Sequence, residues 1–226
     1  MSNIMLNYLL LFVSIIVVSV AQIIVSASYS KYKKVNNCKK VTGFDVARSI
    51  LDKNGMKDVY ITEVQGKLAD HYDPKRKVVR LSSDIYHGTS IASASVAAHE
   101  VGHAIQDRDG YLFMRIRSAM VPLVNFASFA GYFAIMIGLI FGFLRLFWIG
   151  IILELVILLF QLVTLPVELD ASRRGKNELI SNNLVDEDDL SDCSKMLAAA
   201  AFTYVASLLS TLLEILRLVL MAKDRD

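Results

Sequence analysis

Four long apolar stretches constrain the fold of this chain more than any other feature of its sequence. They cover residues 8–27, 118–144, 146–167 and 197–221, and the first two contain no charged residue. About 20 such residues in a helix cross the roughly 30 Å hydrocarbon core of a bilayer. Because 54% of the residues are hydrophobic and the mean hydropathy is +0.47, the chain is too apolar for an ordinary soluble domain. The sequence therefore predicts a mainly α membrane protein on a bundle of three to four transmembrane helices.

The charges around these stretches predict the topology. No basic residue precedes residue 8, whereas five lysines lie between residues 31 and 40, so we expect residues 1–28 to be an anchor whose carboxyl end faces the cytosol. Residues 118–167 would form a transmembrane helical hairpin. Residues 29–117 and 168–196 would then both be cytosolic. The C-terminal apolar helix, 197–226, would either span the membrane or lie against the soluble part. The expected location is the cell membrane, as a multi-pass protein.

Charge and cysteine content exclude several other classes of protein. The 24 basic residues nearly balance the 22 acidic ones, so the chain lacks the strong positive field of a nucleic-acid-binding protein. The two cysteines, Cys38 and Cys193, have no paired spacing and are typical of reduced thiols rather than of a disulfide framework.

The segment before the hairpin has the composition of a small folded domain. Thr42 and Asp45 have the spacing of a capping box, and the apolar residues after them repeat with a helical period up to Asn54. Residues 59–64 and 77–81 are β-branched runs that predict two strands joined by a loop. Residues 78–81 could be an edge strand that receives a peptide or an ordinary inner strand, and the sequence leaves both open.

One pentapeptide carries recognisable chemistry: His99, Glu100 and His103 form an HExxH sequence within the helical run 90–106. On a helix, residues i and i+4 lie on one face about 5 to 6 Å apart, so both imidazoles can bind one ion. A catalytic Zn²⁺ takes three protein ligands and a water whose pKa falls to about 7, and a neighbouring carboxylate can then remove a proton. The motif therefore predicts zinc ligands at His99 and His103 and a base at Glu100.

Small residues around the motif argue against an accidental occurrence in an alanine-rich helix. Ala97, Ala98, Gly102 and Ala104 would let another element approach the histidine pair closely. A third ligand is needed, and two residues qualify. Asp109 has the metzincin spacing, although Gln106 replaces the glycine of that pattern. Glu168 follows the hairpin, which returns the chain to the side of the motif.

Two segments resemble the neutral zinc metallopeptidases of the YugP type: residues 99–106, HEVGHAIQ, and residues 165–172, LPVELDAS. Residues 69–74, 80–82 and 204–206 are similar as well, so the resemblance covers nearly the whole chain. A more distant similarity is to the HtpX-type membrane zinc peptidases. The resemblance implies a gluzincin-like α+β catalytic domain with a small sheet, Zn²⁺ as cofactor and Glu168 as the third ligand. It also implies that Asp170 or Ser172 supports a ligand histidine.

Together these features predict a membrane-embedded zinc metalloendopeptidase that hydrolyses peptide bonds at the cytosolic membrane face, with a zinc-bound water activated by Glu100. Its expected partners are protein or peptide substrates, including membrane proteins, and the lipid bilayer, with no nucleic acid. An intramembrane protease is the rival enzyme, but the motif segment, bounded by Asp84 and Asp107, is too short and polar for a span. A non-catalytic zinc-containing membrane adaptor is the second hypothesis, and it would require a fourth protein ligand.

Overall fold

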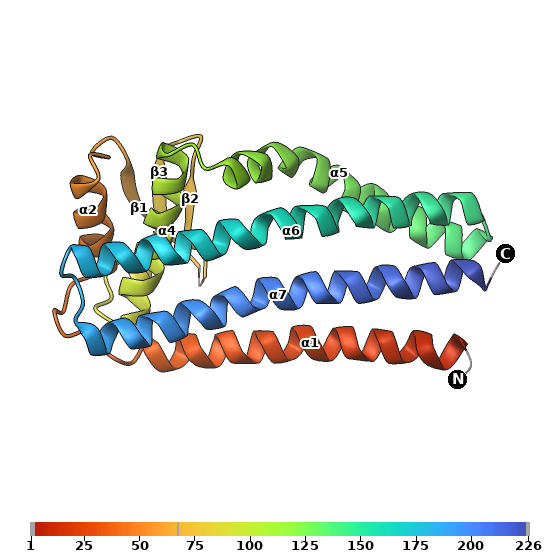
Figure 1. Cartoon of the computed structure of the whole chain (residues 1–226), viewed down its shortest axis with the longest axis horizontal. Coiled ribbons are helices and arrows are strands. Elements are labelled where there is room, and N and C mark those ends of the chain that lie inside the picture. The colour runs from red at the N-terminus through yellow and green to blue at the C-terminus, as the bar shows by residue number, and fades with distance from the viewer. Residues whose placement is uncertain (1–2, 67, 225–226) are drawn as a thin grey trace. The chain divides into compact units, whose positions relative to one another are not determined.

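The structure is a computed structural model that describes residues 3–66 and 68–224 (Figure 1). Within those residues the chain is mainly helical, as predicted, with one small sheet. The elements in chain order are α1 (Asn3–Tyr32), α2 (Gly43–Lys53), β1 (Tyr60–Val64), β2 (His71–Asp73), β3 (Val78–Ser82), α3 (Ser83–Tyr86), α4 (Ile91–Arg108), α5 (Leu112–Phe141), α6 (Leu144–Ser181) and α7 (Glu187–Lys223).

Helices α1, α5, α6 and α7 are each long and apolar enough to cross a membrane. The C-terminal stretch therefore meets the same criterion as the other three, because it belongs to the continuous helix α7. Only Gly142 and Phe143 separate α5 from α6, and Gly142 has a φ of +71°. This left-handed conformation favours glycine and permits the tight turn of a helical hairpin. The turn lies just before Arg145, the residue that separates the second and third apolar stretches of the sequence.

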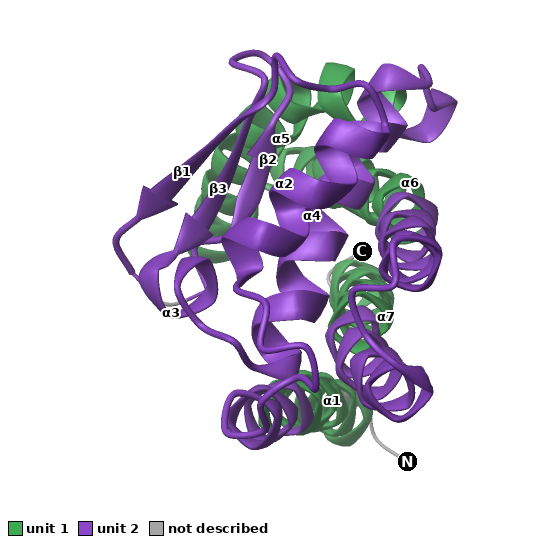
Figure 2. Cartoon of the chain, turned by 90° about the vertical axis from the view of Figure 1, so that its left-hand side faces the viewer, with its two compact units in different colours: residues 1–23, 115–165, 202–226 green, residues 24–114, 166–201 purple. Residues whose placement is uncertain are grey.

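The chain divides into two compact units (Figure 2). Unit 1 comprises residues 1–23, 115–165 and 202–226 and contains most of the apolar helical stretches. Its own buried cluster joins side chains of α6 and α7: Phe147, Ile151, Ile215, Leu218 and Ala222. Many large apolar side chains of unit 1 are exposed, among them Phe126, Phe129 and Leu159. Such a surface is unfavourable in water and is the surface expected of lipid-facing helices.

Unit 2 comprises residues 24–114 and 166–201 and has a conventional hydrophobic core. Helix α2 begins with the predicted capping box: the Asp45 backbone N–H donates to Thr42 Oγ1 at 3.1 Å, and the Thr42 N–H donates to Asp45 Oδ2 at 3.0 Å. Its buried residues, Val46, Ala47, Ile50 and Leu51, recur with helical spacing and pack into the same core as α4. Amphipathic periodicity therefore predicted this helix correctly.

The sheet of unit 2 has three strands in the order β1-β3-β2. Strand β3 pairs with β1 in parallel and with β2 in antiparallel orientation, so Tyr72 lies opposite Val79. The possibility that residues 78–81 form an edge strand is therefore wrong, because β3 is central and largely buried. Strands β1 and β2 form the two edges of the sheet instead. The sequence predicted a loop at β2 because three residues are too few to show a strand period.

Candidate metal centre

Helix α4 positions the histidine pair. It begins at the N-cap residue Ser90, whose hydroxyl accepts a hydrogen bond from the Ser93 backbone N–H, and it runs without interruption to Arg108. The helical repeat therefore places His99 and His103 one turn apart on one face. Their ring centroids lie 4.8 Å apart, with the ring planes at 84°. Both imidazoles can reach a common point beside the helix.

Two glycines let α6 approach α4 closely. A Cβ atom on Gly102 would clash with the backbone carbonyl of Ala171, and one on Gly175 would clash with the carbonyl of Ala98. The two helix backbones are thus in direct contact at both points, and no larger residue fits there without moving one helix. The small residues predicted to admit a neighbouring element do so, and that element is α6.

This contact brings Glu168 to the histidine pair. Glu168 Oε2 lies 3.3 Å from His99 Nε2 and 3.5 Å from His103 Nε2, and the Glu168 side chain is almost completely buried. One candidate ligand atom of each of the three residues lies within 4.8 Å of those of the others. Two imidazole nitrogens and one carboxylate oxygen therefore converge, although the residues come from positions far apart in the sequence.

The second nitrogen of each imidazole is also engaged. His99 Nδ1 lies 3.0 Å from Ser172 Oγ, and His103 Nδ1 lies 3.0 Å from Gln106 Oε1. The Gln106 amide nitrogen donates to the Val167 carbonyl at 2.8 Å and to Asp170 Oδ2 at 3.0 Å. Since both of these partners only accept, the amide oxygen must face His103, so Nδ1 of His103 carries the proton. Its Nε2 lone pair then points toward Glu168, as a metal ligand requires.

Asp170 and Asp109 are held by arginines rather than by the histidines. Asp170 accepts from Arg173 and, at 2.6 Å, from Arg174, which also donates to Asp109 at 2.6 Å. Asp109 is the C-cap residue of α4, where Arg108 also pairs with it. The hydrogen bond from Arg108 lowers the pKa of Asp109, with a further contribution from Arg174. Asp109 is therefore an ion-pair partner outside the cluster of His99, His103 and Glu168.

Glu100 lies next to this cluster and is only 8% exposed. Burial raises the pKa of its carboxyl to about 7, partly offset by the nearby His99. The backbone amide of Tyr72, on strand β2, partly counteracts this rise in the pKa of Glu100. Strand β2 therefore lies close to the Glu100 carboxylate. Glu100 is not one of the three converging ligand groups and is available to hold or release a proton.

The residues present fit a catalytic zinc ion. Two neutral imidazoles and a carboxylate form the nitrogen and oxygen donor set that zinc prefers, and each imidazole has a hydrogen-bonding partner that orients it. Among the described residues this cluster provides three donors, which is the number found in zinc sites that keep one position open. A closed structural site would need a fourth.

Sequence reasoning missed the part played by Gln106. It treated this residue only as a departure from the metzincin glycine, whereas the fully buried side chain links His103 to α6. A weak signal was present, because Gln106 follows His103 by three residues and so shares its helix face. Of the two supporting residues implied by the resemblance, Ser172 contacts His99 directly, and Asp170 lies one hydrogen bond further away, behind Gln106.

Comparisons with known proteins agree with this chemistry. The family model described as putative neutral zinc metallopeptidase matches residues 7–223. The chain is also 45% identical over 200 residues to the protein named putative membrane protease YugP of Bacillus subtilis (strain 168), an alignment that covers 88% of this chain and 89% of that protein. No solved structure matches the chain at a significant level. The resemblance stated from residues 99–106 and 165–172 is thereby confirmed.

Proposed function

The chain belongs to the putative neutral zinc metallopeptidase family, which implies Zn²⁺ as its cofactor, and on that premise we propose that it is a membrane-embedded zinc metalloendopeptidase of the gluzincin type. One observation carries the proposal: donor atoms of His99, His103 and Glu168 lie within 4.8 Å of one another beside Glu100. Histidines one helical turn apart, with a glutamate from a second helix, form the ligand set of that type.

Each residue of the site has a separate role in the proposed hydrolysis of a peptide bond. His99, His103 and Glu168 would hold the ion, while Ser172 and Gln106 orient the two imidazoles. When bound, zinc supplies Lewis acidity that polarises the scissile carbonyl and acidifies the attacking water. Glu100 accepts the proton of that water and then donates it to the departing amine. Burial of Glu100 keeps competing solvent away from this proton transfer.

The side of the membrane follows from charge. The apolar part of α1 is followed directly by five lysines: Lys31, Lys33, Lys34, Lys39 and Lys40. This cluster favours a cytosolic position for the chain that follows. The hairpin of α5 and α6 crosses twice, which would return Glu168 to the same side as His99. We therefore place the site at the cytosolic face of the cell membrane, where protein substrates, including membrane proteins, can reach it.

The base is tested by Glu100→Gln. The purified full-length variant should bind zinc as the parent does, because Glu100 is not a ligand, and should lose peptide cleavage by several orders of magnitude. Cleavage of a defined synthetic peptide library, measured by mass spectrometry, and zinc content, measured on the same preparations, give the two readings. Cleavage by Glu100→Gln at the parental rate would remove the base from this mechanism.

The third ligand is tested by a pair of variants. Glu168→Gln should lose stoichiometric zinc, because a carboxylate ligand is removed from a three-ligand site. Asp109→Asn should retain zinc nearly unchanged, because Asp109 pairs with Arg108 and Arg174 instead. Both proteins are dialysed against the same chelator in the same detergent before the metal is measured. The opposite pattern would transfer the ligand role to Asp109 and remove the support for a gluzincin site.

A further inference from the structure

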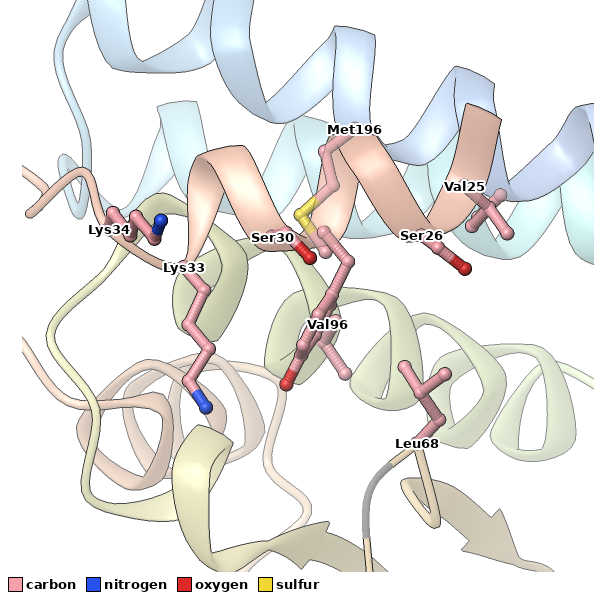
Figure 3. Close-up of a pocket in the computed structure, with 10 residues that line it drawn as sticks. Val25, Ser26, Ser30, Lys33, Lys34, Leu68, Val96 and Met196 are labelled. Atoms are coloured by element: carbon pink, nitrogen blue, oxygen red, sulfur yellow. The ribbon is translucent and has the colours of Figure 1, made fainter. Parts of the chain in front are cut away.

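Unit 2 contains a cavity of about 630 Å³ that the proposed chemistry does not use. Figure 3 shows that its labelled side chains come from α1 and the residues directly after it, from α4 and α7, and from the connection between β1 and β2. We call it the Val96 pocket. Its size is within the range of pockets that hold a drug-sized ligand, so it can take a large side chain together with a neighbouring part of a peptide. Its walls are mainly apolar and include Val25, Leu68, Val96, Met196 and Ala200.

The Val96 pocket adjoins the candidate catalytic carboxylate. Val96 precedes Glu100 by four residues on α4, so the two lie on one helix face, about 6 Å apart along the helix axis. Asp70 provides a second link, because its carboxylate interacts electrostatically with both Glu100 and the pocket residue Tyr29. About 6 Å corresponds to roughly two residues of an extended peptide. A peptide whose scissile bond lies at Glu100 can therefore place a nearby side chain in the pocket.

The pocket also contains polar atoms that a hydrocarbon chain would not satisfy. The Tyr29 hydroxyl is buried and has no hydrogen-bond partner within the part of the chain that the structure describes. A buried donor without a partner is energetically unfavourable. A backbone carbonyl of a bound peptide can accept this hydrogen bond, whereas a lipid acyl chain cannot. The pocket thus favours a peptide over a lipid tail.

The polar end of the Val96 pocket is basic. Lys33 and Lys34 both line it. Lys33 pairs with Asp84, whereas no ion pair engages Lys34 within residues 3–66 and 68–224. An uncompensated ammonium group beside an apolar cavity attracts a carboxylate on the occupant. The complementary ligand therefore has a large apolar side chain with an acidic group close to it.

From this arrangement we infer that the Val96 pocket is a specificity subsite, which takes a large apolar side chain about two residues from the scissile bond of a peptide that carries an adjacent acidic residue. The inference rests on the proposed peptidase function and names the substrate class of that same site. Selection arises from two sources: apolar burial against Val96, Met196 and Leu68, and attraction of the acidic residue by Lys34.

The subsite is tested by filling it. The full-length, zinc-loaded protein is given the synthetic peptide library, and a cleaved peptide is then compared with its analogue in which the apolar residue is alanine. The parent should prefer the apolar peptide by at least about tenfold in kcat/KM, the range set by a few methylene groups in an apolar pocket. Ala200→Phe should bring this ratio close to one while still cleaving the alanine peptide.

Ala198→Phe is the matched control, because it makes the same change on an exposed position of α7 that does not line the pocket. It should keep the parental ratio. Val25→Phe fills the pocket from α1 and serves as a second filling variant if Ala200→Phe does not fold. Parental selectivity in a folded, zinc-loaded filling variant would overturn the subsite while leaving the peptidase function intact. If no variant, the parent included, cleaves any peptide with zinc, the proposed function fails and the subsite with it.

Two further measurements test the role of the Lys34 charge and whether a lipid occupies the pocket. Lys34→Glu should reduce the preference for an acidic residue beside the apolar one, whereas Lys57→Glu, on an exposed turn, should not. Phospholipids that copurify with the parent and with Ala200→Phe are measured by mass spectrometry. Loss of a bound phospholipid in Ala200→Phe with unchanged peptide selectivity would assign the pocket to a lipid and overturn the inference.

Discussion

A neutral imidazole binds a metal through the nitrogen that carries no proton, so the partner of the other nitrogen decides whether a histidine can be a ligand. Gln106 decides this for His103. Its amide nitrogen is committed to two acceptors on α6, which fixes its oxygen toward His103 Nδ1. One buried amide therefore sets the tautomer of a candidate ligand and links α4 to α6 at the candidate metal centre.

Replacing Gln106 by leucine should consequently weaken zinc binding by about 10 to 100-fold, the usual effect of losing the partner of a ligand histidine. Leucine has a similar size but neither accepts from Nδ1 nor donates to Asp170. Competition with a chelator of known affinity measures the zinc affinity of Gln106→Leu and of the control Gln65→Leu, which changes an exposed glutamine. Equal affinity in the two variants would show that His103 needs no such partner.

Among individual residues, the sequence identified those that belong to a short motif or to a segment that resembles a known family. His99, Glu100 and His103 were predicted from local spacing alone, and the structure groups both histidines with Glu168. The choice between Glu168 and Asp109 depended on which element returns to α4, and local spacing does not contain that information. The link from Gln106 to α6 was missed for the same reason, because its two partners on that helix lie more than 60 positions away in sequence.

Among the elements, the packing of α4 against α6 determines the geometry of the site. The two helices touch through backbone atoms at Gly102 and Gly175, where a methyl group would overlap a carbonyl. The separation of Glu168 from the histidines is therefore fixed by helix contact and not by loops. A change in that separation would move one proposed ligand, Glu168, relative to the two histidines.

Gly102→Ala provides a test in which two effects have opposite signs. Alanine is more favourable than glycine in a helix interior by about 1 kcal/mol, so helix propensity alone predicts that Gly102→Ala stabilises the fold. Overpacking against Ala171 costs about 1 to 3 kcal/mol, so we expect a net loss of stability together with weaker zinc binding. Thermal unfolding in detergent and zinc titration measure both. In Gly175→Ala the added methyl group would overlap the Ala98 carbonyl, so this variant should also lose stability and zinc affinity. A higher melting temperature with normal zinc affinity would contradict the close contact.

The helices were more predictable than the strands. Long apolar runs and the capping box at Thr42 mark α1, α2 and the later helices locally, because helical hydrogen bonds join near neighbours. Strand β2 depends on pairing with β3 and has only three residues, which is too short for a recognisable pattern. The central position of β3 likewise follows from pairing on both sides, so its sequence could not distinguish an inner from an edge strand.

For the whole molecule, the number of crossings determines which segments share a compartment. Three span candidates, α5, α6 and α7, separate residue 39 from residue 223. An odd number of crossings would put these two residues on opposite sides of the membrane. If α7 did not cross, they would be on the same side. The sequence left open whether the C-terminal helix α7 spans the membrane or lies against the soluble part. The topology therefore depends on whether α7 crosses.

Single cysteines at Lys39 and Lys223 test this arrangement, since both positions are exposed. Cys38 and Cys193 are first changed to serine and alanine, respectively, so that each protein carries one thiol. In intact cells a membrane-impermeant maleimide should label Lys223→Cys and spare Lys39→Cys until the membrane is opened. Labelling of neither or of both before opening would mean that α7 does not cross, or that the hairpin does not return.

The backbone contacts between α4 and α6 also bear on how the protein would respond to a shortage of zinc. In a zinc finger the ion organises its own ligands, so chelation unfolds the domain. Here the proposed ligands are brought together by helices that share a hydrophobic core with the sheet. The conformational entropy of ordering these side chains is therefore lost when the chain folds and not when the metal binds. We expect cells starved of zinc to keep a reserve of folded, inactive protein, detectable by unchanged circular dichroism in chelator, that regains activity without new synthesis once the ion returns.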